Sequence, residues 1–152
     1  MTTTGSSAAD AVVLGLDRVH QNRMPESSRK PRRSRDENRR RFEEAVDLYL
    51  ESCYARPTAV SVKEFAVFLQ RTQPYLSRIA PRLIGMSVRS FLRTRQLAHA
   101  AELLRRTPAT VTILQVAISS GFGTPWTLTR AFREAFGITP AKYREQCDRR
   151  RN

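Results

Sequence analysis

Beyond residue 41, the apolar positions of the chain recur at the spacing of amphipathic helices. In the first stretch they are separated by three or four residues, the pattern of one helix face. They are Phe42, Ala45, Val46, Tyr49, Leu50 and Cys53. The pattern stops before Pro57, and proline lacks the N–H that a helix interior needs. We therefore predict a first helix that starts near residue 41 and ends before this proline.

Two later helices are marked by capping boxes, in which a Ser or Thr side chain bonds to the backbone three residues on and a Glu or Gln side chain bonds back. Ser61 opens the first box and Thr112 opens the second, and apolar residues flank each box as a hydrophobic staple. Thr72 and Thr124 follow after 11 to 12 residues, and each can cap a further helix. Each half of the chain is therefore predicted to contain a short helix, a turn and a second helix.

The two helix-turn-helix patterns are copies of one another at an offset of 52 residues (128 − 76). The matched positions of the first copy are Thr72, Leu76, Ser77, Arg78, Gly85, Met86, Ser87 and Phe91, and those of the second are Thr124, Leu128, Thr129, Arg130, Gly137, Ile138, Thr139 and Tyr143. Matches in register at a fixed period indicate a duplicated structural unit. Gly121 suits a left-handed turn and Pro125 suits the first helical position, whereas the first copy has Gln70 and Arg71 at its turn and Pro74 near the second helical position.

The second helix of each copy has an apolar and a polar face at about 100° per residue. The predicted core positions are Leu76, Ile79, Ala80 and Leu83 in the first copy, and Leu128, Ala131, Phe132 and Ala135 in the second. The predicted outward positions are Pro74, Ser77 and Arg78, and Trp126, Thr129, Arg130 and Arg133, with Thr127 on the boundary. An α-helix fits the major groove of DNA, so both outward faces are candidate DNA-binding surfaces.

Arginine and aromatic side chains on these faces suggest specific roles. A guanidinium can bond to guanine O6 and N7, and Thr or an apolar ring can touch a thymine methyl group. Arg78 and Arg130 are therefore candidates for guanine contact, with phosphate contact or a salt bridge within the domain as alternatives. We expect Trp126 to be exposed and to contact DNA rather than to join the core. The candidates for phosphate contact are Arg82, Thr129 and Arg133, and for the two arginines the alternative is a solvated charge without a role.

A long helix from Ser87 to about Arg106, ended by Thr107 and Pro108, is predicted between the copies. Its apolar residues lie on one side at Val88, Phe91 and Leu92, and on roughly the opposite side at Leu97, Ala101 and Leu104. Such a helix is expected to touch two bodies, as a connector between subdomains does. We interpret His99 on this helix as a polar surface residue rather than as a ligand.

Charge narrows the choice of partners. The 152 residues carry a formal net charge of +13, which calls for a polyanion such as nucleic acid or an anionic membrane surface. Residues 1–40 are rich in Thr, Ser and Arg and lack sustained periodicity, so we expect a disordered tail with at most a short helix near residues 8–19. The tail is either an arm that follows phosphates or enters a minor groove, or a solvated basic segment that only raises affinity.

Other classes of function find little support. No apolar run reaches the length of about 18 residues that spans a bilayer, and residues 11–14 are too short for a secretory signal, so we expect a cytoplasmic protein. Cys53 and Cys147 stand alone, without the spacing of a zinc site or a disulfide framework. We expect ordinary thiols, and neither a metal nor a cofactor.

Over residues 42–146 the chain resembles the DNA-binding domain of bacterial AraC/XylS-family transcription regulators. The resemblance rests on Ser87, Phe91, Leu92, Arg95, Gln96, Leu97, Ala100, Leu103, Leu104, Ile113, Val116, Ala117, Gly121, Phe122, Leu128 to Phe132, Phe136 to Pro140, Tyr143 and Arg144. It implies an all-α fold of about seven helices, with two helix-turn-helix subdomains joined by a long linker helix.

The resemblance gives boundaries and contacts. The DNA-binding domain would cover residues 41–147, with subdomains at 41–86 and 108–147, the linker helix at 87–107 and a basic C-terminal tail at 148–152. Both recognition helices would enter successive major-groove segments on one face of the duplex. Bases would be contacted by positions matching Pro74, Ser77 and Arg78, and by those matching Pro125, Trp126, Thr127 and Arg130.

Two residues depart from the family pattern. Ala80 stands where a large aromatic residue is usual, as Phe132 is in the second copy, and Pro81 follows it at a helical position. A proline there is expected to end or kink the helix and to weaken base contact by the first copy. The basic tail occupies the place of the family's usual additional domain, so we expect a stand-alone member without a small-molecule effector.

The leading hypothesis is therefore a sequence-specific regulator that binds double-stranded promoter DNA as a monomer, in the nucleoid, with RNA polymerase as a further candidate partner. A sequence-tolerant nucleoid-like or RNA-binding protein is the alternative that the basic tail favours; it predicts a steep salt dependence with little discrimination. A third alternative, a DNA-repair enzyme such as an alkyltransferase, requires a reactive cysteine, and neither Cys53 nor Cys147 has an adjacent base or zinc partner.

Overall fold

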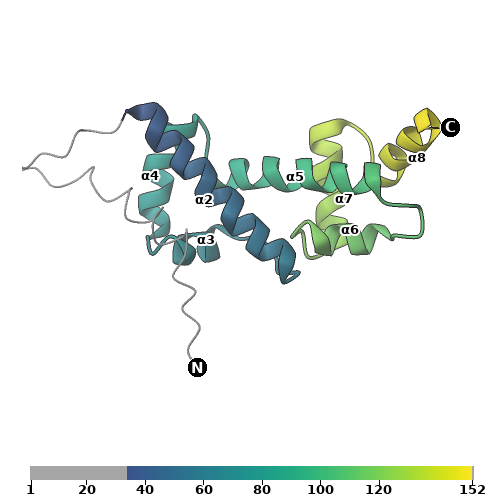
Figure 1. The fold of residues 1–152 in the computed structure, drawn as a ribbon, viewed down its shortest axis with the longest axis horizontal. Helices are drawn as coiled ribbons and strands as arrows, with labels where there is room; N and C mark the ends of the chain where they lie inside the picture. Colours follow the sequence, from purple (N-terminus) through teal and green to yellow (C-terminus); the bar gives the residue numbers. More distant parts are fainter. Residues whose placement is uncertain (1–33, 152) are drawn as a thin grey trace, which may run out of the picture. The chain divides into compact units, whose positions relative to one another are not determined.

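A computed structural model describes residues 34–151 of the chain. This part contains seven α-helices and no strand (Figure 1), which confirms the all-α prediction. The helices are α2 (Arg35–Ala55), α3 (Val62–Phe68), α4 (Gln73–Ile84), α5 (Val88–Arg106), α6 (Ile113–Ser119), α7 (Pro125–Phe136) and α8 (Pro140–Arg151). The short helix predicted near residues 8–19, and the disorder expected up to residue 33, lie outside the described residues.

The first described helix, α2, begins at Arg35, six residues before the predicted start. The Ser34 hydroxyl oxygen accepts a hydrogen bond from the Glu37 backbone N–H at 3.1 Å, as an N-cap does. The acidic Asp36 and Glu37 stabilise the positive end of the helix dipole. These local signals extend the helix into the basic segment, so the expected disordered tail does not reach residue 40.

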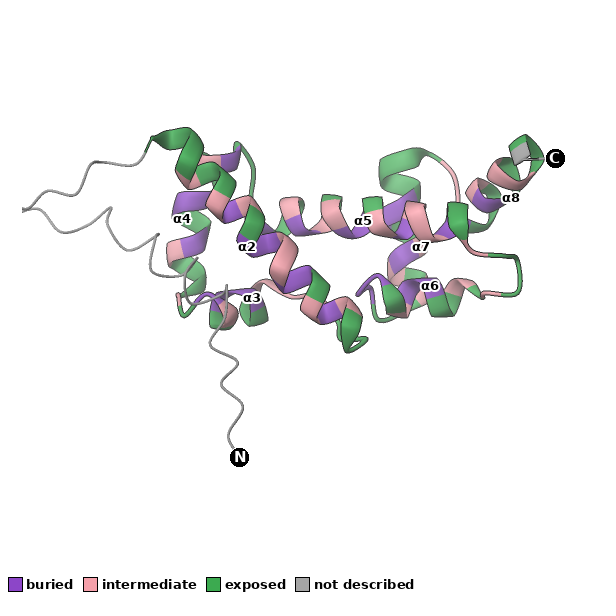
Figure 2. Ribbon diagram, in the orientation of Figure 1, coloured by how far each residue is buried: buried purple, intermediate pink, exposed green. Residues whose placement is uncertain are grey.

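Contacts divide the chain into two compact units. Unit 1 takes the described residues up to Tyr49 together with Lys63–Ser87, and unit 2 takes Leu50–Val62 and the chain from Val88 onward. The apolar face predicted for the first helix is buried at all six positions. Buried and exposed residues alternate along α2, α4 and α7 in Figure 2, as expected for helices with one face against a core.

Aromatic side chains from α2 and α3 fill the core of unit 1. The rings of Phe42 and Phe65 meet edge to face with centroids 5.9 Å apart, and the Tyr49 ring lies 5.1 Å from Phe65 and 5.6 Å from Phe68. Leu76, Ile79 and Ala80 of α4 complete the buried set. Aromatic pairs packed in this way stabilise the folded protein by more than the burial of their apolar surface alone provides.

The two helix-turn-helix turns share one hydrogen-bond pattern but differ in length. After α3, Arg71 N–H bonds to Ala66 O and Gln70 N–H to Val67 O; after α6, Phe122 N–H bonds to Ala117 O and Gly121 N–H to Ile118 O. Both pairs form the Schellman motif, which needs a left-handed residue at its end. That residue is Gln70, at φ 52°, or Gly121, at φ 72°.

These equivalent turn residues are 51 apart (121 − 70), whereas the caps Thr72 and Thr124 are 52 apart. The second turn therefore contains one additional residue, which we assign to Gly123, at φ 75°. The constant offset of 52 predicted from the sequence holds only from the caps of α4 and α7 onward. A glycine accommodates the inserted position because it adopts a left-handed backbone without strain.

Pro81 does not end α4, contrary to the first of the two effects expected of it. The helix continues to Ile84 and closes with Gly85 N–H bonded to Pro81 O at 3.1 Å, as Gly137 N–H bonds to Arg133 O at the end of α7. The proline ring lies on the exposed side of the helix. The equivalent helices α4 and α7 are consequently both 12 residues long.

The small Ala80 is matched by a large residue elsewhere in its unit. Ala80 and Phe65 are both 0% exposed in unit 1, while their counterparts in unit 2, Phe132 and Val116, are 0% and 1% exposed. At these matched positions the aromatic ring is on α7 in unit 2 and on α3, the helix before α4, in unit 1. Exchanges that conserve core volume are the ones that a packed interior tolerates best.

The core of unit 2 gathers around α5, which packs against α6, α7 and α8. Its buried residues are Leu97, Ala100, Leu104, Val116, Ala117, Phe122, Leu128, Ala131 and Phe132. Buried polar groups join helices to loops as well. The Gln96 amide, only 4% exposed, donates hydrogen bonds to Ser120 O at 3.2 Å and to Gly121 O at 2.8 Å, and Arg144 donates to Val111 O at 2.6 Å.

His99 is half-buried, which corrects its interpretation as a simple surface residue. Its ring stacks on Tyr54 with centroids 4.1 Å apart and an interplanar angle of 6°. Burial lowers the pKa of His99, against a hydrogen bond to the Ser119 backbone and the charge of Glu102, which both favour the protonated form. The side chain therefore packs as a neutral ring between two segments of unit 2.

Gly121→Ala should destabilise the protein more than Gly137→Ala. Both glycines have a left-handed backbone, at φ 72° and 73°, so alanine costs about 1 to 2 kcal/mol at either position. A Cβ at Gly121 would also lie 2.5 Å from Val60 Cγ2 and 3.2 Å from Gln96 Nε2, whereas nothing lies within 4 Å at Gly137. Overpacking adds about 1 to 3 kcal/mol. Urea unfolding measures both variants, and equal losses would contradict the close packing of this turn.

Candidate nucleic-acid interface

The second recognition helix, α7, begins abruptly. The Thr124 side chain accepts the Thr127 N–H at 3.2 Å, and Pro125 occupies the first helical position, as predicted. The hydroxyls of Thr124 and Thr127 also bond to each other at 2.7 Å. The capping box predicted at Thr112 is present at the start of α6. These local bonds fix where α7 starts and therefore which residues face outward.

Trp126 and Arg130 lie next to each other on the outward face of α7. Trp126 is 69% exposed, as predicted, and the Arg130 guanidinium carbon lies 5.7 Å from the centroid of its ring. The Arg130 Nε donates to a carboxylate oxygen of Glu134 at 3.0 Å. Arg130 is thus held between an aromatic ring one turn before it and a carboxylate one turn after it.

The outward face of α4 carries an aromatic residue between two arginines. The guanidinium carbons of Arg71 and Arg78 lie 5.8 Å and 6.0 Å from the centroid of the Tyr75 ring. Thr72 caps the helix by accepting the Tyr75 N–H at 3.4 Å. Pro74, Ser77 and Arg78 are all exposed. Both units therefore present an arginine beside an aromatic ring in the first turns of a capped helix.

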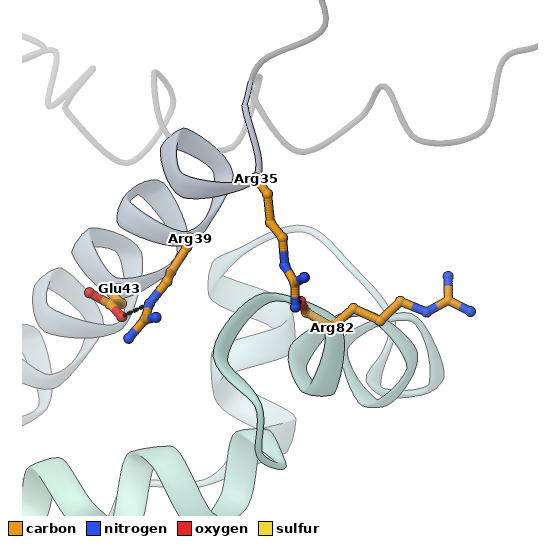
Figure 3. A network of polar contacts seen from close by, with 4 residues as sticks. All are labelled: Arg35, Arg39, Glu43 and Arg82. Atoms are coloured by element: carbon orange, nitrogen blue, oxygen red, sulfur yellow. Dashed lines mark hydrogen bonds and ion pairs between the residues drawn. The ribbon is translucent and has the colours of Figure 1, made fainter.

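The C-terminal end of α4 is joined to the first turn of α2. The Arg35 side chain donates from Nε at 3.2 Å and from Nη2 at 2.9 Å to the backbone carbonyl of Arg82. In Figure 3 the Arg82 side chain extends away from Arg35, while Arg39 bonds to Glu43 on α2. A cation here also suits the negative end of the α4 dipole. Two arginines therefore lie at this end of the helix.

The predicted site residues divide by exposure. The exposed ones are Pro74, Ser77, Arg78, Arg82, Trp126, Arg130 and Arg133, and the half-buried ones are Pro125, Thr127 and Thr129. Leu128, Ala131 and Phe132 are buried as predicted, but Ala135 is exposed and does not join the core. It lies in the last turn of α7.

Three residues of these surfaces were missed by the sequence reasoning. Arg35 was assigned to a disordered tail, and Tyr75 fell between the two predicted faces of α4. Glu134 is acidic, so the expectation that cations contact DNA does not indicate it, although Arg130 and Glu134 have the i, i+4 spacing at which helical side chains meet. That spacing was the available signal.

The charge of Glu134 on α7 also acts on an arginine of α5. The guanidinium of Arg93 on α5 lies over the Phe122 ring, 4.9 Å from its centroid. Burial lowers the pKa of Arg93, the charge of Arg89 lowers it further, and the charge of Glu134 acts in the opposite direction. Glu134 is therefore an anion among cations of unit 2.

Within residues 34–151, no His, Cys, Asp or Glu side chains cluster as metal ligands, and no helix has the length and apolarity to cross a bilayer.

Comparison with known sequences identifies relatives for most of the folded region. The sequence pattern of a family described as a helix-turn-helix domain matches residues 65–146. The probable transcription factor PqrA of Proteus vulgaris is 31% identical over 97 residues, which cover 64% of this chain and 78% of that protein. Over three other curated relatives, the chain spans from about a quarter to about half of their length.

Solved structures provide a second comparison. The DNA-binding domain of the global transcriptional factor AdpA, in complex with a target DNA, superposes with a TM-score of 0.62 at 26% identity, covering 72% of this chain and 95% of that one. A transcriptional regulator with an AraC-type DNA-binding domain from Chromobacterium violaceum has a TM-score of 0.54 at 20% identity, covering 70% and 94%, and is similar in fold.

Arg35→Ala should loosen the last turn of α4, whereas Arg39→Ala should not. Arg35 supplies two hydrogen bonds to the Arg82 carbonyl, while Arg39 bonds only within its own helix. Loss of such bonds at an exposed site costs about 1 kcal/mol. We therefore expect roughly fivefold faster amide hydrogen exchange at Ile84 and Gly85 in the first variant only. Equal exchange in both variants would contradict a capping role for Arg35.

Proposed function

Because the chain belongs to the AraC/XylS family of helix-turn-helix transcription regulators, we propose that it regulates transcription by binding double-stranded promoter DNA in a sequence-specific manner. The family consists of DNA-binding regulators and not of enzymes, which removes the alternative of a repair enzyme. The observation that carries the proposal is that both units present a similar pair of side chains, although the aromatic residues stand at positions that are not equivalent. In both units a Thr-capped helix presents an exposed arginine beside an aromatic ring.

In the proposed complex, α4 and α7 enter successive major-groove segments. Arg78 and Arg130 bond to guanine, since an exposed guanidinium on a helix matches guanine O6 and N7. Trp126 contacts a thymine methyl group or a sugar, and the small exposed Pro74 and Ser77 allow close approach of α4. Pro125 and Thr127, at the half-buried start of α7, complete the base contacts. Phosphate contacts come from Arg82, Thr129 and Arg133.

Two further features of the proposal concern assembly. A duplicated unit supplies two recognition helices in one chain, so a monomer can occupy two groove segments without a dimer axis. RNA polymerase is the proposed protein partner in regulation. The AdpA domain, 26% identical to this chain, is bound to its target DNA in the matched structure, which supports double-stranded DNA as the ligand.

Selection from random-sequence duplex DNA tests the proposal directly. The purified protein is incubated with the pool near physiological salt, and the bound fraction is sequenced. We expect two short enriched boxes, centred about one helical turn, or 34 to 36 Å, apart. One box would mean that a single unit contacts bases. Tight, salt-sensitive binding without enrichment would overturn specificity and favour the sequence-tolerant function that the net charge of +13 permits.

Arg130→Ala should weaken binding to the selected site by about 1 to 3 kcal/mol and change nonspecific binding little. The matched variant in unit 1 is Arg78→Ala. Both side chains are exposed on their helices, so neither truncation should threaten folding. Fluorescence anisotropy with the selected duplex and with a scrambled duplex measures both affinities. Equal losses on the two duplexes would assign the arginine to phosphate contact instead.

A further inference from the structure

The two recognition helices carry opposite charges at one equivalent position. At the offset of 52 that relates α4 to α7, Arg78 matches Arg130, and Arg82 matches Glu134. Four residues after its central arginine, α4 therefore has a second cation and α7 has a carboxylate. The difference lies on surfaces that are otherwise similar, each with an arginine against an aromatic ring.

Helix stability does not explain the carboxylate of Glu134. It lies in the last turn of α7, where the negative end of the helix dipole disfavours an anion. An acidic residue is the less favourable partner on the C-terminal side of an i, i+4 pair. The side chains of Arg130 and Glu134 are 67% and 66% exposed, and exposed ion pairs contribute little to stability. General attraction to DNA does not explain Glu134 either, because a carboxylate repels phosphates.

The geometry of the pair suggests what Glu134 does. Its carboxylate accepts from the Nε of Arg130 at 3.0 Å, while Trp126 lies against the guanidinium from the other direction along the helix. The Nη1 and Nη2 groups, at the far end of the guanidinium, form the edge that suits guanine O6 and N7. An arginine whose guanidinium is already held by two neighbours loses less conformational freedom when it binds a base.

We propose that Glu134 positions Arg130 for base contact and makes unit 2 the more discriminating of the two DNA-contacting units. This inference rests on the proposed function. The carboxylate orients the arginine that contacts a base. Its charge also weakens the attraction to phosphates on every duplex, and only the base contact at the specific site offsets that loss. Arg82 at the equivalent position of α4 has the opposite effect. It adds a cation next to Arg35 and raises the affinity of unit 1 for DNA of any sequence.

Glu134→Gln tests the inference, because glutamine keeps the size and an acceptor but removes the charge. Dissociation constants are measured on the selected duplex and on a scrambled duplex. The specificity ratio is the dissociation constant on the scrambled duplex divided by that on the selected duplex. We expect this ratio to fall by about fivefold, the lower end of the discrimination that a bidentate base contact provides. The matched variant Arg82→Gln should weaken binding to both duplexes by one factor and leave the ratio unchanged.

A double-mutant cycle separates positioning of Arg130 from direct base contact by Glu134. In an Arg130→Ala background, Glu134→Gln should no longer change the specificity ratio, because there is no arginine left to orient. Persistence of the change in that background would make Glu134 a base-contacting residue itself. Thermal unfolding of each variant verifies that the exposed substitutions leave the fold intact.

Two outcomes would overturn the inference in different ways. If the wild-type protein discriminates between the duplexes but Glu134→Gln tightens binding to both by the same factor, Glu134 only repels DNA, and the proposed function stands. If the wild-type protein itself shows no preference, the proposed function fails and the inference fails with it.

Discussion

The backbone of Gly121 holds three segments of unit 2 together. Its carbonyl oxygen accepts the Val60 N–H at 3.0 Å and the Gln96 side-chain amide at 2.8 Å, and its own N–H closes the turn after α6. Gly121 and Gln96 are both buried, so each of these polar groups would cost free energy if it lost its partner. These bonds fix the turn, and the turn sets the direction in which α7 follows it. The exposure of Trp126 and Arg130 depends on that direction.

Unit 1 reaches the same backbone pattern with different side chains. Gln70 adopts the left-handed conformation that Gly121 adopts, and a non-glycine residue there is less favourable because its Cβ crowds the backbone. The aromatic bulk that Phe132 supplies in unit 2 comes from Phe65 in unit 1. The helix-turn-helix segments of the two units therefore share helix lengths and a turn hydrogen-bond pattern, while different side chains fill their cores. Outward residues are free of this packing constraint, so they can diverge further, as Arg82 and Glu134 do.

Local physical rules were sufficient to predict much of this architecture. At Thr72, Thr112 and Thr124 the threonine side chain accepts a hydrogen bond from the backbone N–H three residues on, so the sequence identifies these local caps directly. Helix periodicity likewise predicted the exposure of Trp126 and the burial of Phe132.

The features that local rules do not predict depend on partners distant in sequence, or on residue types that are not typical of a DNA-binding surface. Gln96 bonds across 25 positions, and the His99 ring stacks on a tyrosine of another segment. The additional residue of the second turn follows from the backbone hydrogen bonds of the two turns, which the side-chain pattern does not indicate. The early start of α2 depends on the cap at Ser34, a local signal that lies within a segment of basic, tail-like composition.

A strongly basic chain needs a means of discrimination that charge cannot supply. A net charge of +13 attracts every duplex, and a genome offers about 10⁶ to 10⁹ competing sites. Occupancy of a target therefore depends on the ratio of specific to nonspecific affinity more than on affinity itself. A carboxylate on a recognition helix lowers attraction to phosphates everywhere, but a base contact that it orients offsets the loss at one sequence only. In the proposed complex, negative charge beside Arg130 is thus costly for binding and favourable for selectivity, and the cation at the same position of α4 offsets part of the lost affinity.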